Sequence, residues 1–255
     1  MKQAGQHLGL ANNHFLSGGA SYASSRPTYP PALADALAKW CSETTHALDV
    51  GCGNGQLSTL LAARFDKVTA TDPSETQLQS AARHPSVTYR AEPAERIGIE
   101  ANSVDLITAA QAAHWFDLDA FYREVRRVAK PRAVLALISY GVPVLDGEIG
   151  TRFQQFYWQD VHRYWPEGRQ HVEEGYRSLD FPFEELWLPD LSISRDWSLA
   201  NLIAYICTWS ASRRALKAGR GDIMDKFIRD LGLMWTEPEG QQKVTWPIVG
   251  RLAVI

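Results

Sequence analysis

Apolar residues along the first 140 positions alternate between short continuous runs and stretches with helical spacing. A run that is apolar throughout is typical of a strand buried on both faces, whereas apolar residues three and four apart are typical of a helix. Strands that alternate with helices predict a parallel sheet covered on both faces. The runs predict strands at 46–50, 67–71, 86–91, 104–109 and 133–140. The helical spacing predicts helices at 31–42 (with Leu33, Leu37 and Trp40 on one face), from Leu57 to Phe65, near 75–83, and from Phe121 to a point before Pro131.

The remaining sequence has a different character. Residues 147–164 again have helical spacing, whereas residues 165–190 are rich in proline, glycine and aromatic residues and are predicted to form a loop. A strand is predicted near 191–197, followed by helices near 198–212 and 221–234 and by a last strand at 243–254. The chain is therefore expected to contain seven strands.

The first predicted strand runs directly into a loop with glycine at positions 51, 53 and 55. Glycine tolerates positive φ and has no Cβ, so such a loop lets the backbone approach a ligand closely. Seventeen residues after Gly55, the second strand ends in Asp72. Because a carboxylate at the end of the next strand is suited to a ribose diol, the two features together predict a nucleoside cofactor.

The spacing of this loop does not favour a pyrophosphate. In the G-x-G-x-x-G pattern the sixth position is glycine, whereas Gln56 occupies it here, and no Gly-Lys-Ser/Thr follows. The loop carries Asp49, Cys52, Asn54 and Gln56 and no basic residue. A cationic or zwitterionic nucleoside such as S-adenosylmethionine fits this composition better than a dianion does.

Five motifs in order resemble those of the class I S-adenosylmethionine-dependent methyltransferases. They are Asp49-Val-Gly-Cys-Gly-Asn-Gly55, Asp72-Pro-Ser, Ala94-Glu95, the segment from Asp105 to Phe116 containing His-Trp-Phe, and Tyr22-Ala-Ser-Ser-Arg-Pro-Thr-Tyr-Pro30. The last of these resembles the branch related to trans-aconitate methyltransferase. The resemblance is strong over residues 15–140 and weaker at Phe181-Pro-Phe183 and Thr208-Trp-Ser-Ala211.

This resemblance implies an α/β fold with a Rossmann-like, doubly wound, seven-stranded sheet, mostly parallel with the last strand antiparallel. Strands 6 and 7 would form a closing hairpin, and a helical cap would be inserted after strands 5 and 6, over the carboxyl ends of the strands, where open α/β sheets bind ligands. The expected organisation is an N-terminal arm or lid at 1–31, a cofactor-binding core at 32–140, cap insertions at 141–190 and 198–242, and closing strands at 191–197 and 243–255.

The resemblance also implies a cofactor-binding set. Asp72 would accept from both ribose hydroxyls, although a helix N-cap before Pro73 is the alternative. Asp49 would lie near the cofactor ammonium or act as a structural cap, and Ala94-Glu95 would meet the adenine edge or form a solvated turn. The expected residues are Tyr22, Arg26, Asp49, Gly51, Cys52, Gly53, Gly55, Gln56, Asp72, Pro73, Ala94, Glu95 and Gln111, with S-adenosylhomocysteine as the product.

Residues for the methyl acceptor are less sharply indicated. His114 could be a catalytic base, a carboxylate partner or a hydrogen-bonded wall. Tyr29, Trp115, Trp209 and Arg213 are the candidate substrate residues. Their alternatives are structural, since Trp115 could pack in the core at a helix start, and Trp209 with Arg213 could be simple packing beside a solvated charge.

The expected reaction is methylation of a carboxylate oxygen of a small molecule, for which no general base is required. The alternative is a non-catalytic S-adenosylmethionine-binding module or partner subunit. One departure from the family pattern is Lys130-Pro131-Arg132-Ala133 in place of Pro-Gly-Gly. A non-glycine residue at such a turn costs free energy or forces another turn.

Composition narrows the remaining choices. The 255 residues are 45% hydrophobic with a net charge of −3, so nonspecific nucleic-acid binding is not expected. Cys41, Cys52 and Cys207 show no metal-ligand spacing, which favours reduced thiols in a cytoplasmic protein with no metal site. No apolar signal segment or run of 18 apolar residues is present, so no membrane association is expected. The sequence specifies no oligomeric state.

Overall fold

The computed structural model describes residues 27–235 and 240–255. Tyr22 and Arg26 of the expected cofactor set lie outside these residues. Backbone contacts divide the chain into two compact units, here called the sheet unit and the helical unit. The sheet unit comprises 28–142, 168–193 and 246–255, and the helical unit comprises 143–167 and the described part of 194–245. Residues 168–190, expected in the cap, thus group with the sheet unit.

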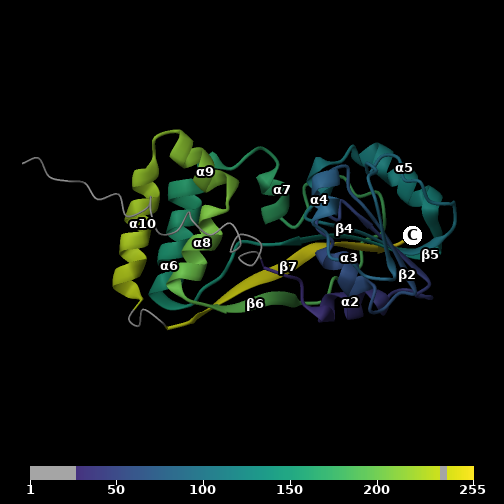
Figure 1. Ribbon diagram of the computed structural model, residues 1–255, viewed down its shortest axis with the longest axis horizontal. Helices are drawn as coiled ribbons and strands as arrows, with labels where there is room; N and C mark the ends of the chain where they lie inside the picture. Colours follow the sequence, from purple (N-terminus) through teal and green to yellow (C-terminus); the bar gives the residue numbers. More distant parts are fainter. Residues whose placement is uncertain (1–26, 236–239) are drawn as a thin grey trace, which may run out of the picture. The chain divides into compact units, whose positions relative to one another are not determined.

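Seven strands form one sheet in the order β3-β2-β1-β4-β5-β7-β6 (Figure 1). The pairs from β3 to β5 are parallel, and β7 runs antiparallel to β5. The predicted doubly wound, seven-stranded α/β fold with an antiparallel last strand is therefore confirmed. The strands are β1 His46–Val50, β2 Lys67–Thr71, β3 Val87–Arg90, β4 Val104–Ala110, β5 Ala129–Tyr140, β6 Leu191–Trp197 and β7 Gln242–Val254.

The register of the parallel strands brings their carboxyl ends to one edge. Val50 at the end of β1 pairs with Thr71 at the end of β2, and Asp49 pairs with Thr108 of β4. All five residues of β1 are buried, as expected for a central strand covered on both faces. The loops that follow β1, β2 and β4 are therefore neighbours, although they are distant in the sequence.

Helices cover both faces of this sheet, with α2 and α3 on one face and α5 on the other (Figure 1). In α5, the Asp117 side chain caps the first turn, and Phe121, Val125 and Val128 are buried at the predicted helical spacing. They pack with Leu48 and other strand residues in one apolar core. The helices of this unit are α2 Pro31–Ala38, α3 Gln56–Leu61, α4 Glu75–Gln79, α5 Leu118–Val128 and α7 Arg169–Glu173, with a 3₁₀ turn at Ala113–Trp115.

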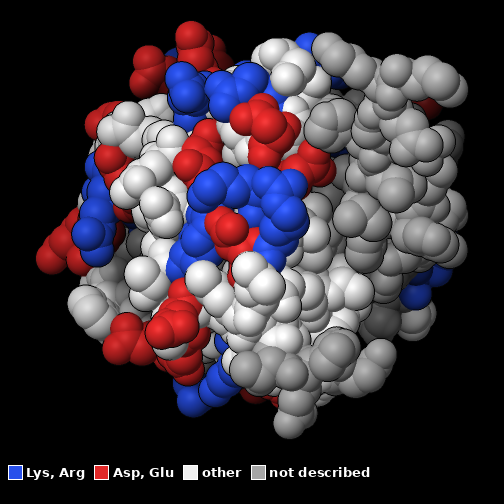
Figure 2. Space-filling view, turned by 90° about the vertical axis from the view of Figure 1, so that its left-hand side faces the viewer, with Lys and Arg blue, Asp and Glu red and all other residues white. Residues whose placement is uncertain are grey.

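The helical unit has an aromatic core of its own. The rings of Phe156 and Phe227 stack with centroids 3.9 Å apart, and Trp209 packs against Phe153 and Phe156. Figure 2 shows basic and acidic side chains interspersed on the face that carries α10, where Lys226 pairs with Asp230. The elements are α6 Gly147–Gln155, a π-helical segment Phe156–Val161, a 3₁₀ turn His162–Tyr164, α8 Leu199–Cys207, α9 Ser210–Lys217 and α10 Gly221–Met234.

Several predicted boundaries are wrong. The single helix expected at 198–212 is two helices, because hydroxyl groups bind the carbonyls at the end of α8: Thr208 donates to Tyr205 and Ser212 donates to Ile206. The first helix ends at Ala38, so Trp40 is 40% exposed instead of sharing the buried face. The expected loop at 165–190 contains α7.

The departure at Arg132 has the backbone conformation that the family pattern assigns to glycine. Arg132 has φ of +66°, and β5 already begins at Ala129, so Pro131 and Arg132 lie within the strand. The pairing of β4 with β5 shifts register between Val104 and Leu106. Arg132 thus keeps the positive φ that the family pattern gives to glycine, and a side chain in this conformation costs free energy of folding. In the part of the chain that the structure describes, no helix is long and apolar enough to cross a membrane.

Candidate functional site

The glycine loop follows the buried strand β1 at the carboxyl edge of the sheet. Gly51, Gly53 and Gly55 have φ of +68°, +55° and +78°, a region that side chains disfavour. A Cβ on Gly51 would lie 2.5 Å from the Cβ of Ala112, and one on Gly55 would collide with the Tyr89 hydroxyl. A Cβ on Gly53 would meet no atom of the described residues within 4 Å. Gly53 is therefore the point at which the loop backbone faces open space.

Asp72 holds the glycine loop at the end of β2 through a hydrogen bond. One carboxylate oxygen accepts from the Gly53 N–H at 2.9 Å, and the other accepts from the Ser74 N–H at 2.8 Å. Ser74, not Asp72, is the N-cap of α4, and Pro73 precedes the cap, so the N-cap alternative for Asp72 is wrong. An ionised carboxylate offers about four acceptor positions, so two remain for hydroxyl groups of a ligand.

Asp49 supplies negative charge beneath the loop. Its side chain is almost fully buried and accepts hydrogen bonds from Ser58 at 2.6 Å and Thr108 at 2.9 Å. Burial raises the pKa of Asp49 to about 6, and the charge of Asp72 adds to this rise, while the two hydroxyl donors oppose it. A cation bound beside Asp49 would relieve this cost by stabilising the ionised form.

Cys52 and Gln56 complete the loop. The Cys52 N–H donates to Thr71 at 2.9 Å, which joins the loop to β2 a second time. Burial raises the pKa of the Cys52 thiol well above its ordinary value, so the sulfur is protonated and unsuited to nucleophilic attack. Gln56 is the first residue of α3, and Gly55 is the N-cap.

Ala94 and Glu95 follow β3 in a loop that contacts the core and α5 of the sheet unit. Ala94 is buried in the core of the sheet unit. The Glu95 carboxylate accepts from the Asp117 N–H at 3.0 Å, which fixes it to the start of α5. The solvated-turn alternative is therefore wrong for the buried Ala94, whereas Glu95 is half-buried in a turn.

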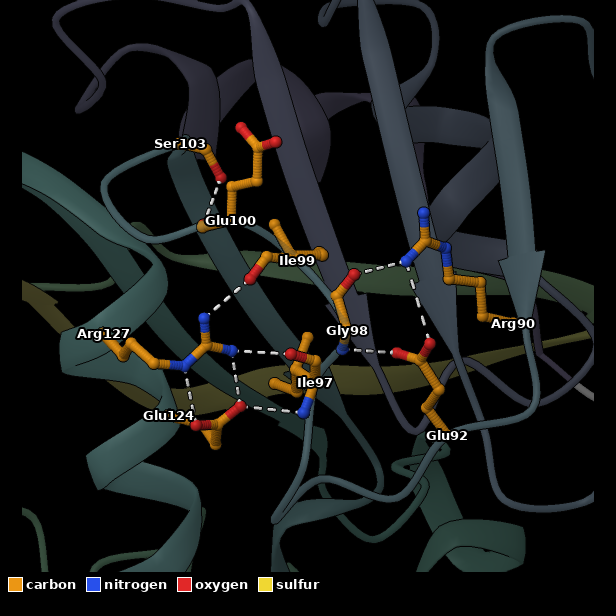
Figure 3. A network of polar contacts seen from close by, with 9 residues as sticks. All are labelled: Arg90, Glu92, Ile97, Gly98, Ile99, Glu100, Ser103, Glu124 and Arg127. Carbon is orange, nitrogen blue, oxygen red and sulfur yellow. Dashed lines mark hydrogen bonds and ion pairs between the residues drawn. The ribbon is translucent and has the colours of Figure 1, made fainter.

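A network of polar contacts holds the next part of this loop from two sides (Figure 3). From α5, Arg127 donates to the carbonyls of Ile97 and Ile99, and Glu124 accepts from the Ile97 N–H. From the end of β3, Arg90 donates to the Gly98 carbonyl at 2.5 Å. The network fixes the backbone just beyond Ala94 and Glu95. Only the i, i+3 spacing of Glu124 and Arg127, typical of a helical ion pair, marks this network in the sequence.

The loop after β4 carries a strained residue. Gln111 has φ of +57°, its N–H donates to the Ile138 carbonyl at 2.8 Å, and its side-chain amide donates to the Ser139 hydroxyl at 3.3 Å. A non-glycine residue in this conformation costs of order 1–3 kcal/mol and commonly marks a functional position. The strain lies at the end of β4, beside the glycine loop.

His114 is held by Tyr176. The Nδ1 atom lies 3.3 Å from the Tyr176 hydroxyl, and the two rings stack. Burial, with smaller contributions from the positive charges of His171 and Arg169, lowers the pKa of His114 to about 4. The imidazole is therefore neutral at pH 7 and is a weak proton acceptor.

The two aromatic residues after His114 have different surroundings. Trp115 is 70% exposed, so the core-packing alternative is wrong for it. Phe116 packs on Phe121 with ring centroids 5.0 Å apart and joins the core of the sheet unit.

Tyr29 carries a buried hydroxyl without a hydrogen-bond partner among the described residues. The side chain is 9% exposed, and its ring meets that of Tyr140 edge-on with centroids 6.0 Å apart. Burial raises the pKa of Tyr29, and Tyr140, Tyr176 and Asp49 raise it further, so the phenol is protonated. This hydroxyl is a donor with nothing in the described chain to accept from it.

Trp209 and Arg213 belong to the helical unit. Trp209 is 6% exposed and packs among Phe153, Tyr157 and Trp165, as the packing alternative predicts. Arg213, one turn further along α9, is exposed. Within 27–235 and 240–255, no three His, Cys, Asp or Glu side chains are grouped to hold a metal ion.

Known proteins with the same arrangement identify the family. Residues 48–137 match the model of a methyltransferase domain. A provisionally named methyltransferase of Dictyostelium discoideum is 31% identical over 237 residues, which are 91% of this chain and 90% of that protein. This chain belongs to the class I methyltransferase family. The solved structure of a provisionally named type II methyltransferase from Anaeromyxobacter dehalogenans is 44% identical with a TM-score of 0.85, covering 90% of this methyltransferase and 97% of that chain.

A third relative has a more specific name. The malonyl-[acyl-carrier protein] O-methyltransferase of Dechloromonas aromatica is 34% identical over 122 residues, which are 47% of this chain and 44% of that protein. Methyltransferases with this fold generally bind S-adenosylmethionine. The edge described above, where the loops after β1, β2 and β4 meet, is therefore the candidate site of this methyltransferase.

Proposed function

We propose that this methyltransferase transfers a methyl group from S-adenosylmethionine to a carboxylate oxygen of a small molecule, as a member of the trans-aconitate-related branch. The observation that carries the choice of acceptor is the state of His114. Its pKa of about 4 makes it a poor general base at neutral pH, because efficient bases have pKa values near the working pH. A carboxylate is already ionised and needs no base.

The residues of the glycine loop fit the proposed cofactor. The open backbone at Gly53 would face the nucleoside, and the two remaining acceptor positions on Asp72 match the two ribose hydroxyls. The charge of Asp49 suits the ammonium of the amino acid tail, and the fastened loop at Ala94 and Glu95 would contact adenine. Two further residues of the proposed cofactor set, Tyr22 and Arg26, lie outside the described residues.

For this methyl transfer, the main contribution of the protein is to align the two reactants. When bound, S-adenosylmethionine supplies a methyl carbon already activated by its sulfonium leaving group. The acceptor oxygen forms a bond to that carbon as the carbon–sulfur bond breaks, and the bonding pair stays on sulfur, so the products are a methyl ester and S-adenosylhomocysteine. The residues of the site would hold the two reactants in line and exclude water. No proton moves in this reaction.

The relative from Dechloromonas aromatica supports transfer to oxygen, since its name describes an O-methyltransferase acting on a malonyl group carried by a protein. An acceptor with a phenol or alcohol group is the competing choice, and it would need a base. General bases contribute about 10²- to 10⁴-fold to rate. Replacing His114 therefore separates the two classes of acceptor.

The test is to incubate the full chain with S-adenosylmethionine and a panel of mono-, di- and tricarboxylic acids and phenols. Formation of S-adenosylhomocysteine and of a methyl ester would be followed by mass spectrometry. We expect ester formation with at least one acid, and the His114→Gln variant should keep its rate within about tenfold. Methylation of phenols alone, with loss of that activity in His114→Gln, would overturn the carboxylate assignment. Cofactor-dependent thermal stabilisation without any product would instead support a non-catalytic module.

A further inference from the structure

Three phenols come together in the sheet unit from distant parts of the chain. Tyr29 precedes α2, Tyr140 ends β5, and Tyr176 follows α7. The rings of Tyr29 and Tyr140 are in edge contact, and Tyr176 holds His114. No sequence motif contains more than one of these residues, so only the fold reveals the group.

Their hydroxyl groups are not equivalent. The Tyr176 hydroxyl lies 3.3 Å from His114, and Tyr140 also has an interaction partner. The Tyr29 hydroxyl is buried without any partner in the described chain. A buried hydroxyl left without a hydrogen bond destabilises the folded protein, so such groups are rare and call for an explanation. Another buried tyrosine of the sheet unit, Tyr122, follows the usual rule, since its hydroxyl donates to the Asp180 carbonyl at 2.7 Å.

The order of the strands indicates which ligand Tyr29 would meet. Asp72, the proposed ribose residue, lies at the end of β2, on one side of β1. Tyr140 lies at the end of β5, beyond β4 on the other side of β1. A reactant that attacks in line must approach the methyl group from the side opposite the leaving sulfur. The β4 and β5 ends, with Tyr29 against Tyr140, are thus the side away from the adenosine.

We propose that the Tyr29 hydroxyl donates a hydrogen bond to an oxygen atom of the methyl acceptor and so selects an oxygen-bearing acceptor at this subsite. The inference rests on the proposed function and names the residue that recognises the acceptor. Tyr29 would bind the non-reacting oxygen of a carboxylate and leave the second oxygen to attack the methyl carbon. The phenol stays protonated and takes no proton from the acceptor, so it binds and orients but does not act as a base.

The Tyr29→Phe variant distinguishes acceptor binding from a purely structural role of Tyr29. The Tyr29 hydroxyl has no partner in the described chain, so its removal leaves no described group unpaired, and Tyr29→Phe should unfold at the same temperature as the wild type or slightly higher. Its affinity for S-adenosylhomocysteine should be unchanged. Its kcat/KM for the acceptor should fall by about 10- to 100-fold, the usual effect of losing a hydrogen bond to a charged group.

Tyr122→Phe is the matched control. Its hydroxyl is bonded within the protein, so this variant should unfold at a lower temperature, by about 2–6 °C, and should keep kcat/KM within about twofold. The opposite pattern, in which Tyr29→Phe loses thermal stability and keeps its activity, would overturn the inference. Equal losses of S-adenosylhomocysteine affinity and of acceptor kcat/KM would assign Tyr29 to the cofactor and would also overturn it.

The failure of this inference can be told apart from failure of the proposed function. If the acceptor proves to be a phenol and Tyr29→Phe still lowers its kcat/KM, the carboxylate assignment fails and the Tyr29 subsite stands. If no acceptor is methylated, succinate, citrate, benzoate and phenol are titrated by calorimetry into the protein saturated with S-adenosylhomocysteine. Binding that is weakened about 10-fold or more in Tyr29→Phe supports the subsite. A panel that binds both proteins equally, or neither, overturns it.

Discussion

Replacing Gly53 by alanine tests whether the cofactor meets the backbone at the centre of the glycine loop. Gly53 has φ of +55°, and a Cβ there would have no atom within 4 Å in the part of the chain that the structure describes. The cost to folding is therefore only conformational, about 1 kcal/mol for an L-residue in the left-handed region. Since domains are stable by roughly 5–15 kcal/mol, the variant should remain folded.

The effect on binding should be larger than the effect on folding. The added methyl group projects into the open space that the proposed cofactor would occupy at contact distance. We expect S-adenosylmethionine affinity to fall by about 10- to 100-fold, which corresponds to roughly 1.4–2.8 kcal/mol. Gly51 is a poorer probe, because its Cβ would lie 2.5 Å from the Cβ of Ala112 and would disturb the fold itself.

Gly219 in the helical unit provides the matched control. It has φ of +74°, and a Cβ there would likewise contact none of the residues in 27–235 and 240–255 within 4 Å. Gly219→Ala should lower the free energy of unfolding by the same amount, about 1 kcal/mol, and leave cofactor affinity unchanged. Calorimetric titration and urea unfolding of the two variants and the wild type give both quantities. Wild-type affinity in Gly53→Ala would refute close approach at residue 53, and equal losses in both variants would point to a general effect of destabilisation.

Three further predictions follow from single residues. Arg132→Gly should raise the unfolding temperature by about 1–4 °C, because glycine tolerates the positive φ of this exposed position better than arginine does. As a control, Arg123→Gly at an exposed helix position should lower the unfolding temperature by a similar amount, about 1–4 °C. A lower unfolding temperature in both variants would contradict this reasoning. Asp72→Ala should weaken S-adenosylmethionine binding by about 100-fold or more in calorimetric titration, because it removes the anchor of Gly53 and the proposed ribose acceptor, so unchanged affinity would reject the assignment. The pKa of Asp49 in the folded protein, about 6, lies above its ordinary value of about 3.9, so ionisation of Asp49 opposes folding. The free energy of unfolding is therefore highest below about pH 4, where Asp49 is protonated, and falls as pH rises through 6. In urea unfolding between pH 4 and 8, Asp49→Asn should therefore gain on the order of 2–3 kcal/mol relative to the wild type as pH rises, and a difference independent of pH would show that the carboxyl is not perturbed.

The central elements of the fold were predictable because their signal is local. Strands β1, β2 and β6 have the predicted bounds. In β1 and β2 the signal is the nearly continuous burial of strands in a parallel sheet, whereas β6, at the sheet edge, alternates between buried and exposed residues. The break between α8 and α9 was not predictable from apolar spacing, because it depends on the hydroxyl groups of Thr208 and Ser212, which bind carbonyls of the preceding turn. Helix α7 was missed because five residues give too short a pattern to recognise.

Of the candidate site, the sequence by itself determined the part that is proposed to bind the methyl donor. The positive φ at Gly51, Gly53 and Gly55 and the acid at the end of β2 are requirements of the backbone, and they leave a pattern of residues at fixed spacing. The tertiary structure decided that Asp72 also anchors Gly53. It also decided that His114 is a weak base, because burial sets its pKa.

On the proposed acceptor side, the sequence named Tyr29 among four candidate residues, and the tertiary structure decided which of its properties distinguish it. The Tyr29 hydroxyl is buried without a hydrogen-bond partner in the described chain, and its ring contacts Tyr140 from a distant segment. Burial and hydrogen-bond satisfaction depend on contacts between residues far apart in the chain, and a single sequence carries no spacing that encodes them. The glycine loop therefore predicts the methyl donor from the sequence, and the proposed recognition of the acceptor rests on contacts that only the fold creates.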